Sequence, residues 1–225
     1  MQNKLRCAAL LIAIAAASSV QASSEDAVVV TATRIPERAS VLTSDVSVIT
    51  REQIERAPQA SLAGLLQAQP GLQVTTNGGI GTPSSVSIRG GSSQQTLVLI
   101  DGERLSSSTV GTTALENIPL NQIERIEILR GPASSLYGAD AVAGVIQIFT
   151  RKGEGAPHVS LEAGAGSYRT TVGSFDYGGR TGNTSFNVNL GYTDSGSFSA
   201  TKPGTYGYNP DRDPYRNRNL SAQIT

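Results

Sequence analysis

The sequence predicts a chain in two parts, a small α+β domain followed by antiparallel strands of the kind that build a transmembrane β-barrel. Residues 45–151 mix short apolar strands with short helical stretches, whereas from residue 157 onward apolar and polar residues alternate. Glycine contributes 24 of 225 residues and aromatic residues only 5%, which is typical of a turn-rich chain rather than a helical one.

The first segment, residues 1–22, is predicted to be a secretory signal peptide. Basic residues precede an apolar run at residues 8–17, and small residues up to Ala22 suit cleavage. This run is too short for a membrane core of about 30 Å, which needs roughly 20 helical residues. Because Cys7 is the single cysteine and leaves with the signal peptide, the mature fold cannot depend on disulfides or thiolate metal sites.

The next segment, residues 23–44, is predicted to be a mobile linker that begins with an adhesive strand. Its sequence EDAVVVTATR places three consecutive valines near the start of the mature chain. A β-branched segment without a sheet of its own can add as an edge strand to the sheet of a partner. Alternatively, the valines pair with the sheet of the domain that follows.

Residues 45–151 carry local signals for strands and helices. A strand ends at Thr50, which can cap a helix together with Gln53 in a capping box. A second helix is indicated by leucines at i, i+3 and i+4, and it stops at Pro70. These leucines are Leu62, Leu65 and Leu66.

The stretch TLVLIDGERL, residues 96–105, predicts a buried strand that ends in a hairpin turn at Asp101-Gly102. Two more strands are expected at residues 123–129 and 145–149, with a helical turn at residues 133–137 between them. Long loops are expected at residues 75–85 and 105–118.

The alternating region predicts four strands with short and long connections. A tight turn is expected at Gly166-Ser167, a second short connection at residues 178–182, and a long polar loop at residues 194–214. Soluble sandwiches also alternate with period two, but this order of connections suits an outer-membrane barrel whose long loop lies outside. Since the smallest such barrels have about 8 strands, we expect this sequence, which stops at Thr225, to be the front of a longer or truncated product.

Enzymatic function is not expected. His158 is the single histidine, and the glycine-rich stretch GGIGTPSSVSIRGG lacks both the Lys-Ser/Thr of a P-loop and the helix of a dinucleotide fingerprint. The formal net charge is +0, so nothing favours a nucleic-acid partner.

Several motifs together resemble the TonB-dependent outer-membrane transporters, and within them the branch that transports cobalamin. They are DAVVVTATR, QPGLQVTTNGG, SIRG, LVLIDGERL, IERIEILRGPASSLYGADAVAGVIQI and NPDRD. The resemblance implies that residues 45–151 form a plug and residues 157–225 the first strands of a barrel of about 22 strands. It also implies residence among the lipids of the outer membrane of a Gram-negative bacterium, and active, TonB-dependent uptake of cobalamin.

The resemblance further implies a TonB box and a ligand site. Serine hydroxyls and free backbone groups in loops can orient a polar ligand, although the same residues also suit ordinary solvated turns. The sequence departs from the cobalamin branch at Pro83 and Ser92. The TonB box would be Asp26, Ala27, Val28, Val29, Val30, Thr31, Ala32 and Thr33, and the ligand residues would be Pro83, Ser85, Ser92, Val110 and Gly111.

Two charged sets complete the implied sites. Asp211 and Asp213 match a calcium-binding pair, although Ca²⁺ takes about 6 to 8 oxygen ligands and Asp-Arg-Asp-Pro also suits a plain polar turn. Arg89 and Arg130 would lock the plug to barrel glutamates beyond Thr225. Alternatively, Glu124 and Glu127 form ordinary cross-strand pairs within the plug.

Two other functions remain open at this point. One is an iron-siderophore receptor of the same family, which aromatic or basic outer loops would favour. The other is a truncated, plug-only module that binds TonB or ligand and transports nothing.

Overall fold

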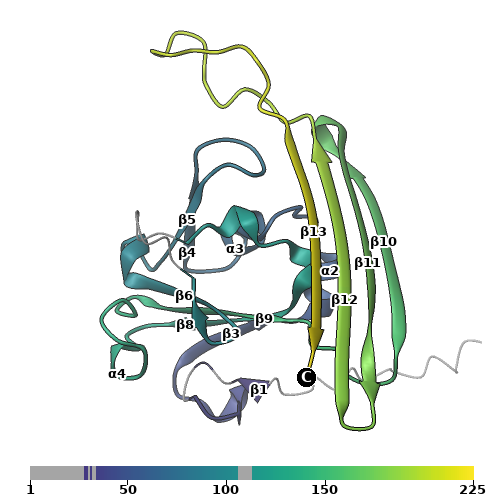
Figure 1. Ribbon diagram of the computed structural model, residues 1–225. Coiled ribbons are helices and arrows are strands. Elements are labelled where there is room, and N and C mark those ends of the chain that lie inside the picture. The colour runs from purple at the N-terminus through teal and green to yellow at the C-terminus, as the bar shows by residue number, and fades with distance from the viewer. Residues whose placement is uncertain (1–27, 30, 32–33, 106–112) are drawn as a thin grey trace, which may run out of the picture.

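The computed structural model describes residues 28–29, 31, 34–105 and 113–225. An α+β domain lies against one face of a tall, curved antiparallel sheet (Figure 1). Within the described residues, no helix is long and apolar enough to cross a membrane. The predicted fold class, an α+β domain followed by antiparallel strands, is confirmed.

The α+β domain is built on a five-stranded sheet in the order β3-β8-β9-β6-β7. The strands β6 and β9 are parallel and the other pairs are antiparallel, so the predicted strand at residues 96–100 is paired on both sides. The hairpin turn at Asp101 and Gly102 has φ of 49° and 91°, as that dipeptide predicts. The strand bounds are Asp45–Ile49 (β3), Thr96–Ile100 (β6), Glu103–Arg104 (β7), Ile123–Arg130 (β8) and Gly144–Thr150 (β9).

Short helices and a separate hairpin cover this sheet. The predicted capping box is present at the start of α2 (Arg51–Arg56), where Thr50 accepts from the Gln53 backbone and Gln53 accepts from the Thr50 backbone. The remaining elements are α3 (Leu62–Gln67), α4 (Ser134–Tyr137), the hairpin β4 (Leu72–Thr76) and β5 (Ser84–Ile88), and the pair β1 (Val28–Val29) and β2 (Glu37–Arg38). Single 3₁₀ turns are η1 (Ala39–Val41), η2 (Ser93–Gln95), η3 (Leu115–Asn117), η4 (Leu120–Gln122) and η5 (Ser167–Arg169).

Apolar side chains bury both faces of the five-stranded sheet. One cluster joins the helix leucines to Ile126, Ile128, Ile146 and Ile148, and the other surrounds Leu129 and Val145 on the opposite face. Burying each such side chain contributes roughly 1.5–3 kcal/mol. The domain therefore has a core of its own.

The tall sheet contains β10 (His158–Gly166), β11 (Thr170–Thr181), β12 (Thr184–Ser195) and β13 (Tyr215–Ile224), in chain order and antiparallel. The predicted connection at residues 178–182 is wrong, because β11 continues to Thr181 and turns at Gly182-Asn183. Gly179 therefore lies within β11. A Cβ at this position would lie only 2.6 Å from the backbone nitrogen of Pro157. A close approach of two backbones, rather than a turn, explains this glycine.

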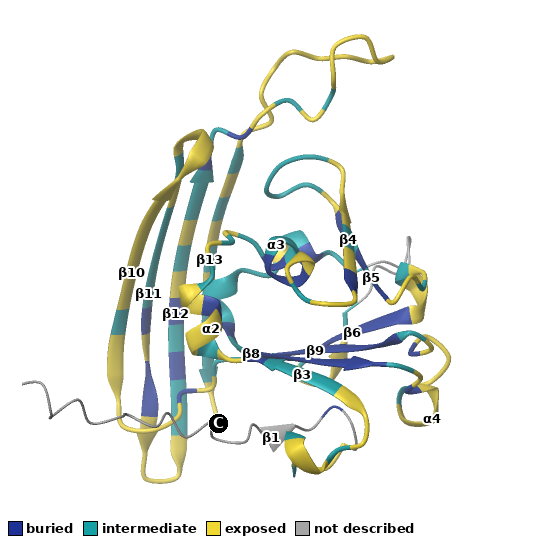
Figure 2. Cartoon of the chain, turned by 180° about the vertical axis from the view of Figure 1, so that it is seen from behind, coloured by how far each residue is buried: buried dark blue, intermediate teal, exposed yellow. Residues whose placement is uncertain are grey.

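The two faces of the tall sheet differ in chemistry. Leu161, Leu190 and Leu220 align in register on the outward face and remain 77%, 46% and 68% exposed. On the opposite face Asp176, Asn187 and Asn189 are buried. Figure 2 shows buried segments on β11 and β12. Apolar outside and polar inside is the pattern of a membrane barrel and the reverse of a soluble sheet.

Candidate functional site

A polar seam joins the α+β domain to the tall sheet. Arg151, just past β9, places Nη2 2.9 Å from Oδ1 of Asp176 on β11; the Asp176 side chain is buried and that of Arg151 is largely buried. Asp176 Oδ2 also accepts a hydrogen bond from Asn187 Nδ2 at 2.9 Å. A buried charge needs such pairing, so this contact fixes the register of the two parts.

Side-chain amides extend the seam along the tall sheet β10–β13, which we call the wall. Asn121 Nδ2 donates to Asn189 Oδ1 at 2.6 Å, and Asn189 Nδ2 donates back to the Asn121 carbonyl at 3.2 Å. Gln122 Nε2 donates to Asn219 Oδ1 at 3.1 Å. Sequence reasoning did not anticipate these contacts, although the alternation in β12 placed Asn187 and Asn189 on one face, which was the available signal.

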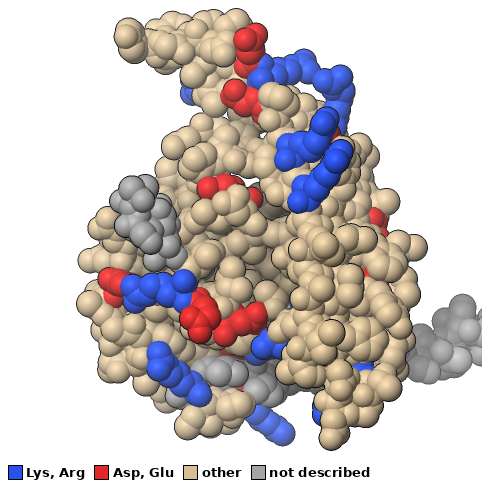
Figure 3. Space-filling model, in the orientation of Figure 1, with Lys and Arg blue, Asp and Glu red and all other residues tan. Residues whose placement is uncertain are grey.

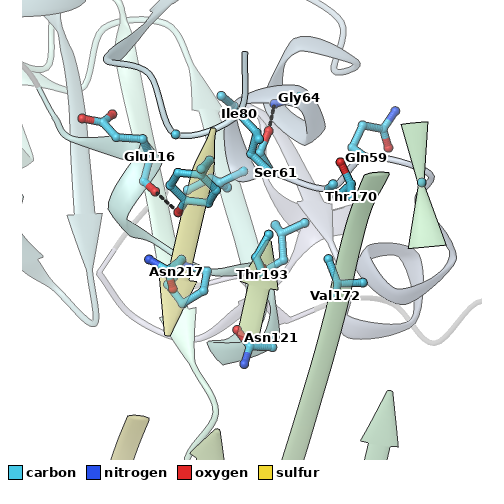
Figure 4. Close-up of a pocket in the computed structure, with 18 of the residues that line it drawn as sticks. Gln59, Ser61, Gly64, Ile80, Glu116, Asn121, Thr170, Val172, Thr193 and Asn217 are labelled. Carbon is cyan, nitrogen blue, oxygen red and sulfur yellow. Dashed lines mark hydrogen bonds between the residues drawn. The ribbon is translucent and has the colours of Figure 1, made fainter. Parts of the chain in front are cut away.

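A cavity of about 510 Å³ lies above the seam, between the α+β domain and the wall. Its lining includes hydroxyl and amide groups of Ser61, Thr170, Thr193 and Asn217, which come from both sides of the space (Figure 4). At its edge the Tyr215 hydroxyl lies 3.5 Å from the Glu116 carbonyl oxygen. These groups can hydrogen-bond to water or to the polar parts of a ligand, while much of the remaining lining is apolar.

The predicted ligand residues lie near the outer end of the α+β domain. Pro83 is exposed just before β5, and Ser85 is half-buried within it. Between them, the Ser84 backbone N–H donates to Glu116 Oε2 at 3.3 Å. Ser92 is exposed and forms a capping box with Gln95 at η2. Val110 and Gly111 lie outside the described residues, so the proposed set stays a prediction.

The segment predicted to be a TonB box touches the α+β domain at one described residue. Thr31 is fully buried, and its backbone N–H and hydroxyl donate to Glu127 Oε2 at 2.8 and 2.7 Å. The Tyr137 hydroxyl donates to the Thr31 carbonyl at 2.9 Å. Burial raises the pKa of Tyr137, which keeps its hydroxyl protonated as a donor.

The remaining residues of that segment are placed as follows. Val28 and Val29 pair with Arg38 and Glu37 in the short β1-β2 ladder, within the linker rather than in the main sheet. Asp26, Ala27, Val30, Ala32 and Thr33 lie outside the described residues. Their role in binding a partner stays a prediction.

Comparison with known proteins identifies the α+β domain. The family model of the TonB-dependent receptor plug domain matches residues 38–145. The chain belongs to the TonB-dependent receptors, whose members lie in the outer membrane. It is 41% identical over 160 residues to the vitamin B12 transporter BtuB of Vibrio cholerae serotype O1, covering 71% of this chain and 26% of that protein.

Other relatives agree on the family. BtuB of Photobacterium profundum is 34% identical over 209 residues, covering 90% of this chain and 33% of that protein. The siderophore receptor PirA of Acinetobacter baumannii has a TM-score of 0.63 at 26% identity, covering 80% of this chain and 29% of that structure. The ferric enterobactin receptor PfeA of Pseudomonas aeruginosa has a TM-score of 0.61 at 26% identity, covering 81% of this chain and 31% of that structure. The chain therefore spans about a quarter to a third of the length of these relatives.

Within the plug, Arg89 and Arg130 converge on one carboxylate. Arg89 forms an ion pair with Asp45 Oδ2, and Arg130 Nη1 lies 3.4 Å from Asp45 Oδ1. Arg130 Nε also donates to the Pro70 carbonyl at 2.9 Å. In the described part of the chain these arginines are bound within the plug, and a lock to barrel glutamates stays a prediction.

The plug glutamates do form pairs inside the plug. Glu127 Oε1 accepts from Arg125 Nε at 3.0 Å, and Glu124 Oε2 lies 3.7 Å from Arg151 Nε. Burial raises the pKa of Glu124 in spite of the opposing effect of Arg151. The predicted cross-strand pair is present for Glu124, whose partner follows the neighbouring strand β9, but is wrong for Glu127, whose partner Arg125 lies two positions away on the same strand.

The predicted calcium pair lies in the long loop, residues 196–214. Asp213 Oδ2 accepts from the Ala200 backbone N–H at 2.8 Å, and the Asp211 backbone N–H donates to Asn209 Oδ1 at 3.0 Å. Lys and Arg side chains lie beside the acidic ones in this part of the surface (Figure 3). The described residues bring no three His, Cys, Asp or Glu side chains together as a metal site, so Asp211 and Asp213 alone do not fit the coordination of Ca²⁺.

Proposed function

We propose that this chain supplies the plug and first barrel strands of a receptor that takes up cobalamin across the outer membrane, driven by TonB. The observation that carries the proposal is the likeness to two vitamin B12 transporters, at 41% and 34% identity. That likeness exceeds the 26% identity to the siderophore receptors.

The polar seam supports a plug that can be remodelled. Water can replace the amide hydrogen bonds of Asn121 and Gln122, because the net value of such a bond is only about 0.5–1.5 kcal/mol. Most of the apolar core is formed between the plug's own sheet and helices, although Ile54, Leu62 and Leu115 also line the cavity beside the wall. A pull on the N-terminal segment could therefore rearrange the plug against the wall without unfolding all of it.

The handle for that pull is proposed to be the TonB box, residues 26–33. The β-branched valines suit edge addition to a sheet of TonB, where main-chain hydrogen bonds supply the affinity. Thr31 would have to leave Glu127 and Tyr137 before the segment could extend to a partner. The buried Glu127 carboxylate thus opposes release until another interaction replaces it.

The remaining assignments belong to the same proposal. Ligand would contact Pro83, Ser85, Ser92, Val110 and Gly111, while Arg89 and Arg130 would also meet barrel carboxylates. The signal peptide, residues 1–22, would direct export and would then be cleaved after Ala22. A calcium site at Asp211 and Asp213 would require further oxygen ligands from other loops.

The ligand is tested by equilibrium binding to the full-length receptor in outer-membrane vesicles. We expect saturable binding of cyanocobalamin and none of ferric enterobactin. The Ser85→Ala and Ser92→Ala variants should weaken cobalamin binding, whereas Ser134→Ala on the exposed start of α4 serves as a control. Binding of the ferric siderophore instead would support the second candidate, an iron-siderophore receptor, which the structural matches favour.

The coupling to TonB is tested at Val29. Proline removes a backbone donor that strand addition needs, so Val29→Pro should abolish energy-dependent uptake while leaving ligand binding intact. Val29→Ile keeps the donor and the β-branched shape and should retain uptake. Transport that persists in the proline variant would rule out this segment as the handle.

A further inference from the structure

The tip of the β4-β5 hairpin, residues 77–82, rests directly on the base of the long loop 196–214. A Cβ at Gly78 would lie 2.9 Å from the Cβ of Ala200, and a Cβ at Gly81 would overlap the ring of Tyr215. Gly81 also has a φ of +85°. Here the plug backbone itself touches the wall, and no side chain fits between them.

Both limbs of the long loop meet at this contact. The departing limb carries Ala200, whose backbone N–H donates to Asp213 Oδ2 at 2.8 Å on the returning limb. The Asp213 backbone N–H donates to the Phe198 carbonyl at 3.3 Å. Tyr215 then begins β13, so the returning limb enters the wall where its ring covers Gly81.

The plug side of the contact is braced. Thr82 Oγ1 donates to the Gly79 carbonyl at 2.8 Å, which closes the tip on itself. Ser84 donates to the Glu116 carboxylate from its backbone N–H at 3.3 Å, and the Glu116 carbonyl lies 3.5 Å from the Tyr215 hydroxyl. The plug side of this contact is backbone, which has no rotamers with which to absorb a shift, so moving the tip must turn the Tyr215 side chain or break the contact.

We propose that the glycine tip, residues 77–82, positions the long loop 196–214, with Gly81 and Tyr215 as the positioning residues. Pro83 and Ser85, the predicted ligand residues, directly follow the tip, so a ligand that shifts them shifts the loop as well. The coupling of the loop to ligand rests on the proposed function. The contact between the tip and the loop is independent of the proposed function, because residues of this chain alone form it.

The test measures trypsin cleavage after Arg212 in the ligand-free, full-length receptor in outer-membrane vesicles. Gly81→Ala should raise the cleavage rate about tenfold, because it displaces Tyr215 and frees the loop. Gly90→Ala is the matched control, since Gly90 has a similar φ of +76° and nothing within 4 Å of its Cβ position. Equal rates in these two variants would overturn the proposal.

A double-mutant cycle isolates the contact. Tyr215→Ala should itself speed cleavage, and adding Gly81→Ala should then change the rate no further, because their shared contact is already lost. Full additivity of the two effects would contradict the proposed pairing.

Added ligand tests the coupling of the tip to the loop. Ligand should slow cleavage after Arg212 in the wild type and should slow it clearly less in Gly81→Ala. Equal protection of both proteins would refute the link to ligand.

A disulfide keeps the inference testable if Gly81→Ala does not fold. The Gly78→Cys/Ala200→Cys pair should cross-link on oxidation and slow cleavage after Arg212, and reduction should reverse this. Failure to cross-link in a receptor that remains folded until heated would show that the tip does not rest on the loop. A receptor that fails to bind cobalamin but still shows these loop effects would reject the proposed ligand and retain the contact.

Discussion

The plug sheet and the wall sheet use apolar residues in opposite ways. In the plug, isoleucines of β8 and β9 face a core made by the plug's own helices, and Ile126, Ile146 and Ile148 are fully buried. In the wall, leucines of β10, β12 and β13 face outward, and the polar residues are the buried ones. One sheet makes its own interior, whereas the other turns an apolar face outward and a polar face toward the plug.

This contrast shows where each part derives its stability. The plug sheet depends on packing, which needs no partner. The wall depends on contacts across its inner face, above all Arg151 with Asp176 and the asparagine pairs. Substitutions in the two sheets should therefore differ in size and in what they disturb.

The largest effect is expected at the seam. Asp176→Ala leaves the largely buried Arg151 guanidinium with only the more distant, half-exposed Glu124, and breaking a buried pair costs about 3–5 kcal/mol. The denaturant concentration that detaches the plug from the wall should fall accordingly. Asp194→Ala removes the exposed, solvent-screened pair with Arg216 on the same sheet and should cost much less. Similar costs for the two variants would mean that the seam does not hold the plug.

A core substitution should weaken the plug alone. Ile126→Ala deletes fully buried methyl groups between the sheet and the helices and should cost about 2–5 kcal/mol. Hydrogen exchange of β8 and β9 amides measures that cost, and the β11 and β12 amides report on the wall. If the wall amides lost protection to the same degree, the two sheets would form one cooperative unit.

A charge on the lipid-facing side should affect the wall alone. Leu190→Arg places a cation in the outward apolar row and should cost about 2–4 kcal/mol if that row lies at the middle of the bilayer. Folding yield into lipid vesicles measures the effect. Ser174→Arg places the same side chain on the inner face, beside Glu162 and the cavity, and should be tolerated. Equal losses would show that both faces meet the same environment.

Local signals allowed much of the plug to be predicted from sequence. The Thr50 capping box, the Leu62 helix and the Asp101-Gly102 turn each depend on residues a few positions apart, and each is present. The wall strands followed from alternation. The error at residues 178–182 arose because glycine serves both turns and close backbone approaches, and only the position of Pro157 distinguishes them.

Long-range polar contacts could not be predicted in this way. Thr31 and Glu127 are separated by 96 positions, and Asn121 and Asn189 by 68. Hydrogen bonds between such distant residues leave no periodic trace in either segment. The convergence of Arg89 and Arg130 on Asp45 was missed for the same reason, and the family motif pointed to other partners.

The smallest effect is expected at Glu124, which shares Arg151 with Asp176 across the boundary between the two sheets. Burial raises the folded-state pKa of Glu124 above its usual value, so the folded plug binds this proton more tightly than the unfolded chain. Plug stability should therefore fall as pH rises from the unfolded pKa through the folded pKa, and then level off.

The Glu124→Gln variant should lack this dependence and be more stable than the wild type at neutral pH, by less than about 1 kcal/mol because the side chain is 44% exposed. Arg151 keeps Asp176 in this variant, so no buried cation is left unpaired. Plug unfolding measured between pH 4 and pH 8 compares the two proteins. A net loss of stability at neutral pH would instead show that Arg151 needs both carboxylates, and that the plug core and the seam are not energetically separate.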